Sequence, residues 1–172
     1  MESAPSQGSR FEVVLEFPID TEAALVQKPE INDAPADNSL LCGMKFLCAE
    51  DNEINSEILQ MLLESKGATC KIYPDGQQIV DAFAKVKPGD YDMILMDVQM
   101  PVMDGLEATR RIRSSENPLG KTIPILAMTA NAFLEDMQKS KEAGMDEHLS
   151  KPVDIAMLEQ AVRRFRITPP RR

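Results

Sequence analysis

A chain of 172 residues is long enough for one domain with a substantial core and some further segments. Its hydrophobic content of 43% and charged content of 27% are ordinary for a soluble globular protein. The net charge of −9 argues against a surface that binds nucleic acid.

The first forty residues differ in composition from the rest of the chain. Residues 9–17 (SRFEVVLEF) alternate between apolar and polar side chains, which predicts a half-buried strand. A single strand without a partner is not stable alone. Residues 18–43 contain three prolines among acidic and small residues, which is typical of a linker. We interpret the chain as a fragment of a longer protein.

From Met44 onward, short apolar runs alternate strictly with helical patterns. Asp75 with Gln78 resembles a capping box, Asp154 resembles an N-cap, and Gly67 and Gly144 are expected to end helices. We expect strands at 44–49, 68–73, 92–96, 123–128 and 146–150, and helices at 53–66, from 76 to about 87, 105–116, 132–143 and 154–166.

The first of these helices has a clear apolar periodicity. Its sequence EINSEILQMLLESK places Ile54, Ile58, Met61 and Leu62 on one helical face. Apolar strands that each return through a helix predict a doubly wound α/β fold, with a five-stranded parallel sheet and helices on both faces.

Composition also limits the kinds of site. The sequence has no apolar run of about 18 residues, which a membrane-spanning helix requires, and no signal-peptide pattern follows Met1. Cys42, Cys48 and Cys70 form no C-x-x-C motif, which indicates reduced thiols of a cytosolic protein. The only histidine is His148, so a metal site built from several histidines is excluded.

Polar side chains stand at the carboxyl ends of the expected strands, where functional residues of such sheets gather. Glu50 and Asp51 follow the first strand, and Asp97 follows the third. Thr129 and Lys151 end the fourth and the fifth. Each has an ordinary structural explanation, such as a helix N-terminus, an N-cap or a solvated lysine. These separate explanations do not account for their shared position.

Clustered carboxylates repel one another unless a cation lies between them. Oxygen ligands without cysteine or histidine favour a hard ion, Mg²⁺ before Zn²⁺. A free carboxylate beside Mg²⁺, an ammonium and a hydroxyl matches the requirements of phosphoryl transfer to an aspartate.

Four segments in this order, AEDNEIN, ILMDVQMPVMDG, AMTANA and HLSKP, resemble the receiver domain of two-component signalling over about residues 44–166. The resemblance implies the flavodoxin-like strand order 2-1-3-4-5, a Mg²⁺ cofactor and a Lys151–Pro152 bond that is often cis. It also implies that Asp97 is the phosphoacceptor, that Thr129 donates a hydrogen bond to its phosphoryl group and that Lys151 pairs with that group. For Mg²⁺ it implies Asp51 and the Gln99 backbone carbonyl as direct ligands, with Glu50 acting through metal-bound water.

The resemblance further implies a conformational switch. In receivers the hydroxyl of the residue at Thr129 moves toward the phosphoryl group, and an aromatic residue three before the lysine fills the space. Here that residue is His148 instead of the more usual Tyr or Phe. We therefore expect a softer switch that depends on pH, or a solvent-facing histidine without coupling.

In detail, the motifs resemble the receivers attached to hybrid histidine kinases. The start GSRFEVVLEF is similar to the last Gly-rich turn and strand of a kinase ATP-binding domain. We expect 1–17 to be its remnant, 18–43 a linker, 44–166 the receiver and 167–172 a tail. The chain lacks a phosphorylatable-histidine segment and nucleotide-binding boxes, so we expect it to catalyse only its own aspartyl phosphorylation and dephosphorylation.

The implied partner is a phosphohistidine-bearing kinase or a histidine-phosphotransfer domain. We expect neither nucleic acid nor membrane contact, and a weak dimer stays open. The expected location is the cytoplasm, with anchoring of the parent protein in the inner membrane left open.

There are three alternative functions. A flavodoxin-type FMN module needs a phosphate loop rich in Ser, Thr and Gly where this chain has EDNE. A haloacid-dehalogenase-like phosphatase needs a second aspartate at position 99, which is Gln. A degenerate receiver that serves only as an interaction module stays open, although the intact set of site residues argues against it.

Overall fold

The structure of this protein is a computed structural model that describes residues 2–4, 8–10, 39–130 and 134–167. The chain divides into two units, Met1–Asp33 and Ala34–Arg172. We describe each unit by itself. Predictions that fall on residues 11–38, 131–133 and 168–172 lie outside the described residues.

The first unit contains a short antiparallel pair. Strand β1 (Glu2–Ala4) pairs with β2 (Gly8–Arg10), with Ser3 opposite Ser9. The strand predicted at 9–17 therefore has a partner in its described part, and the expectation of an unpaired strand is wrong there. Its remainder lies outside the described residues.

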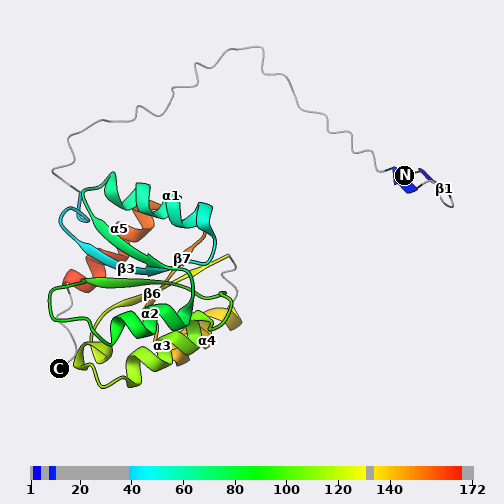
Figure 1. Ribbon diagram of the computed structural model, residues 1–172. Helices are drawn as coiled ribbons and strands as arrows, with labels where there is room; N and C mark the ends of the chain where they lie inside the picture. The colour runs from blue at the N-terminus through cyan, green and yellow to red at the C-terminus, as the bar shows by residue number, and fades with distance from the viewer. Residues whose placement is uncertain (1, 5–7, 11–38, 131–133, 168–172) are drawn as a thin grey trace, which may run out of the picture. The chain divides into compact units, whose positions relative to one another are not determined.

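The second unit is built around a five-stranded parallel sheet in the order β4-β3-β5-β6-β7 (Figure 1). This is the predicted order 2-1-3-4-5, and the predicted fold class is confirmed. The strands are β3 (Lys45–Ala49), β4 (Thr69–Tyr73), β5 (Met93–Asp97), β6 (Ile125–Thr129) and β7 (Glu147–Ser150). The helices are α1 (Glu53–Glu64), α2 (Gly76–Phe83), α3 (Gly105–Ser114), α4 (Leu134–Ala143) and α5 (Ile155–Ile167), with a 3₁₀ helix η2 (Pro118–Lys121).

Helices cover both faces of the sheet: α1 and α5 lie on one side, and α2, α3 and α4 on the other (Figure 1). Side chains alternate along each strand, so Phe46 and Cys48 face α1 and α5, whereas Leu47 and Ala49 face α2 and α3. All five residues of β5 are buried, as expected for the central strand of a sheet covered on both faces. The two covered faces make two core layers that hold the strand ends in place.

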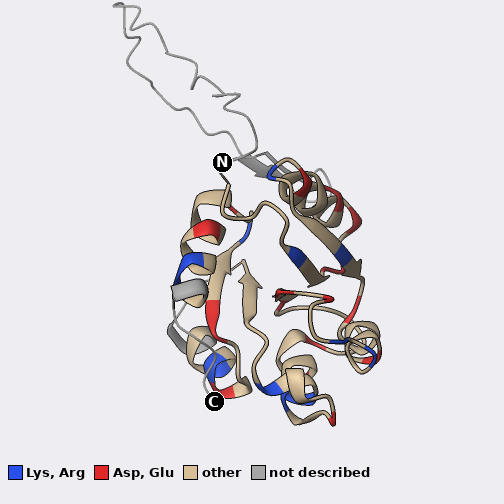
Figure 2. Ribbon diagram, turned by 90° about the vertical axis from the view of Figure 1, so that its left-hand side faces the viewer, with Lys and Arg blue, Asp and Glu red and all other residues tan. Residues whose placement is uncertain are grey.

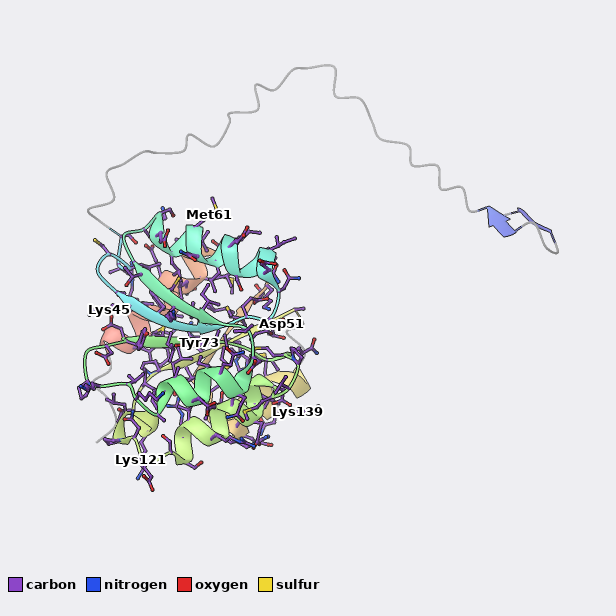
Figure 3. All side chains as sticks on the ribbon, in the orientation of Figure 1. Lys45, Asp51, Met61, Tyr73, Lys121 and Lys139 are labelled. Atoms are coloured by element: carbon purple, nitrogen blue, oxygen red, sulfur yellow. The ribbon has the colours of Figure 1, made fainter. Side chains whose placement is uncertain are left out.

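Helix α1 packs with a different face from the one that its apolar periodicity suggested. Leu59 and Leu63 are buried against the sheet. Of the predicted face, Ile54, Ile58 and Met61 are 67%, 54% and 70% exposed, and Leu62 is half-buried. Met61 points away from the sheet (Figure 3). The helix is apolar on two faces, and only the tertiary fold selects the one that is buried.

Helix α2 begins as predicted but ends earlier. The Asp75 carboxylate caps the helix, because it accepts from the Gln78 backbone N–H at 2.8 Å. The Gln78 side-chain amide donates to the same carboxylate at 2.7 Å, whereas in a full capping box that side chain would bond to the Asp75 backbone N–H. The helix stops at Phe83 instead of about residue 87. The Asn117 side-chain amide donates to the Phe83 and Val86 carbonyls at 3.0 and 2.8 Å, which ties the end of α2 and the turn after it to the segment before η2.

The packed unit also extends into the predicted linker. Leu41 is fully buried in the core layer beneath α1 and α5, beside Met44. Ser39 Oγ donates to Glu159 Oε1 on α5 at 2.7 Å. The receiver boundary predicted at residue 44 therefore leaves out a core side chain. Within the described residues, no helix has the length and apolar character needed to cross a membrane.

Candidate functional site

The site lies at the carboxyl end of the sheet, where the loops after β3, β5, β6 and β7 meet. Figure 3 shows Lys45 and Asp51 at opposite ends of β3, with Asp51 at the functional edge. Carboxylate oxygens of Glu50, Asp51 and Asp97 lie within 4.8 Å of one another. The sequence predicted this cluster, and the parallel alignment of β3 and β5 brings it together.

Lys151 bridges the two buried carboxylates of the cluster. Its Nζ lies 2.5 Å from Glu50 Oε2 and 2.6 Å from Asp97 Oδ2. Glu50 and Asp97 are only 3% and 4% exposed, so water screens these charges little. The Lys151–Pro152 peptide bond is cis, as the resemblance implied. One ammonium thus offsets part of the repulsion between two buried anions.

Burial and charge act in opposite directions on this pair. Burial raises the pKa of Asp97 above its usual value, and the hydrogen bond from Lys151 offsets this only in part. Burial alone would lower the pKa of Lys151, but its hydrogen bonds to Asp97 and Glu50 raise that pKa above its usual value. The lysine stays charged, and the Asp97 carboxylate is less stable than one in water.

The loop after β5 orients Asp97. The Gln99 backbone N–H donates to Asp97 Oδ1 at 3.0 Å. Gly105, the first residue of α3, approaches β5 so closely that any side chain there would collide with the Asp97 carbonyl oxygen. Between them, Val102 has φ = +66°, and Met103 N–H donates to the Pro101 carbonyl at 2.7 Å. The loop is therefore a tight turn, strained at a β-branched residue.

The donor set fits a hard divalent cation. Three carboxylates converge with oxygen atoms only, and no histidine or cysteine takes part. Asp51 is exposed, so an ion can enter from solvent, whereas Glu50 and Asp97 form a buried wall. Acidic and basic residues are otherwise interspersed along the helices and loops of the unit (Figure 2).

Thr129 lies where the sequence predicted it. It ends β6, the strand beside β5, and stands one residue past Met128, which is the register partner of Asp97. Its carbonyl accepts from the Lys151 backbone N–H at 2.9 Å. This bond ties the loop that carries the lysine to the end of β6.

His148 lies on β7, opposite Ala127. Because side chains alternate along strands, His148 and Thr129 project from the same face of the sheet. The imidazole is half-buried, and its Nε2 is buried without a hydrogen-bond partner among the described residues. Burial lowers the pKa of His148, and the nearby Glu147 carboxylate opposes this shift. The neutral imidazole therefore prevails at neutral pH.

The predicted site did not include Asn55. Its side-chain amide donates to Glu50 Oε1 at 2.9 Å, from the first turn of α1. Asn55 is part of the segment AEDNEIN, but an asparagine in a first helical turn is ordinary by itself. Its role depends on the angle at which α1 leaves the sheet.

The comparisons with known proteins agree with this geometry. The sequence model of the family described as "Response regulator receiver domain" matches residues 46–163. The chain is 40% identical over 134 residues to sensor histidine kinase RcsC of Escherichia coli. This alignment covers 78% of this chain and 13% of RcsC. The chain is also 40% identical over 126 residues to hybrid signal transduction histidine kinase I of Dictyostelium discoideum, covering 72% of this chain and 7% of that protein. The chain thus spans only a small part of these relatives.

Solved structures show the same likeness. One is the receiver domain of sensor histidine kinase PA1611 from Pseudomonas aeruginosa, which has a magnesium ion in its active-site cleft. It is 38% identical to this chain, and the two structures superpose with a TM-score of 0.65. The match covers 74% of this chain and 100% of that chain. Another is the receiver domain of Ssk1 from Saccharomyces cerevisiae, in complex with the histidine phosphotransfer protein Ypd1. It is 31% identical, with a TM-score of 0.61, and the match covers 69% of this chain and 86% of that chain.

Proposed function

Because this chain belongs to the response regulator receiver domain family, and so to two-component phosphorelay signalling, we propose that it accepts a phosphoryl group from a phosphohistidine onto Asp97. One observation carries the proposal. The Asp97 carboxylate is buried against an ammonium at 2.6 Å, in a cluster of three carboxylates at the carboxyl edge of a parallel sheet. A merely structural aspartate has no need of this arrangement.

The residues at the site would have two roles, which are binding of the cation and stabilisation of the phosphoryl oxygens. Asp51, Asp97, the Gln99 carbonyl and, through water, Glu50 would hold Mg²⁺, which supplies positive charge for the phosphoryl oxygens when it is bound. The structure of the PA1611 receiver with magnesium supports this assignment. Lys151 contributes a second positive charge that is already 2.6 Å from Asp97.

The chemical step is a transfer between two nucleophiles. An Asp97 carboxylate oxygen attacks phosphorus in line while the P–N bond to the donor histidine breaks. The electron pair of that bond returns to the ring nitrogen, and the ring, protonated on its other nitrogen, leaves as neutral imidazole. Lys151 would stabilise the extra charge on the new aspartyl phosphate, and Thr129 would donate a hydrogen bond to it.

The donor would be a protein or domain that carries the phosphohistidine, as the complex of the Ssk1 receiver with the histidine phosphotransfer protein Ypd1 suggests. We assign its contact surface to the apolar stripe of α1, which consists of Ile54, Ile58 and Met61. The stripe begins three residues after Asp51, and its side chains are at least half exposed. An exposed stripe of this kind beside a reaction centre suits the apolar face of a partner helix.

The response to phosphorylation would pass through Thr129 and His148. Both project from the same face of the sheet, and the unpaired Nε2 of His148 leaves that ring weakly held. The parent protein would be a hybrid histidine kinase that lies in the cytoplasm or is anchored in the inner membrane. Residues 1–17 would be the end of its ATP-binding domain, and residues 18–38 a linker.

Intact-mass measurement after incubation with acetyl phosphate and Mg²⁺ tests the proposal. We expect one added phosphoryl group, absent after chelation of Mg²⁺ and absent in Asp97→Asn. Phosphorylation that persists in Asp97→Asn would move the acceptor to another residue. Complete failure of the wild-type chain to be phosphorylated would favour the degenerate receiver that serves only as an interaction module.

A further inference from the structure

The Glu50 carboxylate is held from two sides by groups of different kinds. Its Oε2 contacts the Lys151 ammonium at 2.5 Å, and its Oε1 accepts from the Asn55 amide at 2.9 Å. The carboxylate is 3% exposed, so each oxygen needs a protein partner or a metal-bound water. Asn55 and Lys151 together fix its rotamer.

Asn55 and Lys151 are not equivalent once a phosphoryl group is on Asp97. Lys151 also contacts Asp97, and a phosphoryl group on Asp97 would draw the ammonium away from Glu50. Asn55 has no other recorded side-chain partner among the described residues and can keep its hydrogen bond. Because an amide is neutral, it orients the carboxylate without cancelling the charge that a cation needs.

The first turn of α1 is rigid enough for this task. The Asn52 side chain accepts from the Asn55 backbone N–H at 3.1 Å and caps the helix. Ser56 Oγ donates to the Glu50 carbonyl at 3.3 Å. The backbone of Asn55 is thus tied to the strand end that carries the carboxylate.

We propose that Asn55 is a positioning residue of the cation site, which holds the Glu50 carboxylate in the orientation that Mg²⁺ binding requires. The inference rests on the proposed function, since it assigns Glu50 to a metal. Loss of such an outer partner typically weakens metal binding by about 10- to 100-fold. Asn55 is exposed and water can partly replace it, so we expect the lower end, about tenfold, for Asn55→Ala.

Isothermal titration of the full chain with Mg²⁺ tests this. Gln60→Ala is the matched control, because it removes an amide that donates to a carboxylate, Glu64, on the same helix but away from the site. We expect Asn55→Ala to weaken binding about tenfold with little change in Tm, and Gln60→Ala to leave it unchanged. Asn55→Gln keeps the amide donor and should bind Mg²⁺ more tightly than Asn55→Ala.

A double-mutant cycle decides whether Asn55 acts through Glu50. In a Glu50→Gln background, Asn55→Ala should change the Mg²⁺ affinity by less than about twofold. Equal weakening in both backgrounds, or no effect of Asn55→Ala alone, would overturn the positioning role while Mg²⁺ binding stands. A wild-type chain that binds no Mg²⁺ would instead overturn the proposed function and this inference with it.

Discussion

At the scale of single residues, burial of the proposed acceptor Asp97 bears on the pH dependence of stability. Burial raises the pKa of Asp97, so the folded chain binds a proton there more readily than the unfolded chain does. The ionised carboxylate therefore destabilises the folded state as the pH rises above the usual carboxyl pKa of about 3.9.

We accordingly expect Asp97→Asn to raise the Tm at pH 7 by a few degrees in the absence of Mg²⁺. The difference should vanish near pH 3, about one unit below the usual pKa of the carboxyl, where both side chains are neutral. Scanning calorimetry at both pH values measures it, with Asp81→Asn on the exposed side of α2 as the control. An unchanged or lower Tm at pH 7 would mean that Lys151 more than offsets the burial.

A second residue-scale cost lies on α3, one turn after Gly105. Thr109 on α3 is fully buried, and its hydroxyl has no hydrogen-bond partner among the described residues. Thr109→Val keeps the shape and removes the unpaired group, so we expect a gain of about 1 kcal/mol in the free energy of unfolding. Urea denaturation measures this. The exposed Thr122→Val should stay within about 0.5 kcal/mol of wild type, and a loss at Thr109 would show that its hydroxyl is paired.

At the scale of elements, α1 has two apolar faces, one buried and one exposed. Leu59 and Leu63 anchor it, while the stripe of Ile54, Ile58 and Met61 is exposed and is the surface that we assign to the donor under the proposed function. Met61→Glu should therefore slow phosphotransfer from a histidine-phosphotransfer protein by about tenfold or more, the factor that corresponds to loss of about 1.4 kcal/mol of contact. Phosphorylation by acetyl phosphate, which needs no docking, should not change.

Met157→Glu is the matched control for this prediction, since Met157 is a methionine of α5 that is 41% exposed on another helix. Transfer rates from phosphorylated donor protein, measured by rapid quench, compare the two variants. Equal slowing in both would place the donor elsewhere or point to a general effect of added charge. Slowing with acetyl phosphate in Met61→Glu would indicate damage to the site itself.

Another element-scale feature is the connection between α3 and the loops before β6 and β7. The Arg113 guanidinium donates to the carbonyls of Gly120, Ile123 and Gly144 at 2.7 to 2.9 Å. It also pairs with Asp146 at 2.7 Å. One partly buried side chain, 19% exposed, thus donates to three backbone carbonyls that lie outside the α-helices and strands.

Arg113→Ala should cost about 2 kcal/mol or more of the free energy of unfolding, because it leaves the three carbonyls without this donor and Asp146 without its cationic partner. Arg110→Ala on the same helix removes only an exposed pair with Glu107 and should cost less than about 1 kcal/mol. Denaturant titration of both variants gives the comparison. Similar losses in the two would mean that water replaces the guanidinium.

At the scale of the whole molecule, the packed receiver begins earlier than the composition of the chain indicated. Leu41 fills the core, and Ser39 bonds to α5, although both lie in a stretch that reads as linker. A chain that begins at Asn38 should therefore unfold like the full chain. A chain that begins at Gly43 should lose about 2 to 5 kcal/mol, as for deletion of a buried leucine.

Thermal and urea unfolding of the two shortened chains and the full chain distinguish these boundaries. Equal stability of the chains that begin at Asn38 and Gly43 would contradict the burial of Leu41. A loss already present in the chain that begins at Asn38 would show that residues 1–37 stabilise the receiver.

The sequence by itself determined the alternation of strands and helices, the parallel sheet and the four strand ends that carry Asp51, Asp97, Thr129 and Lys151. These follow from local patterns: apolar runs of strand length, helix caps, and polar residues directly after each run. The parallel topology then brings the strand ends to one edge, so the site could be predicted without any distance.

Only the tertiary structure decided which face of α1 is buried, where α2 ends and where the receiver begins. It also decided that Asn55 holds Glu50. Each of these depends on contacts between residues distant in the chain or on the angle between two elements. Periodicity within one helix cannot choose between two apolar faces, because the free energy of burial depends on the surface that each face meets.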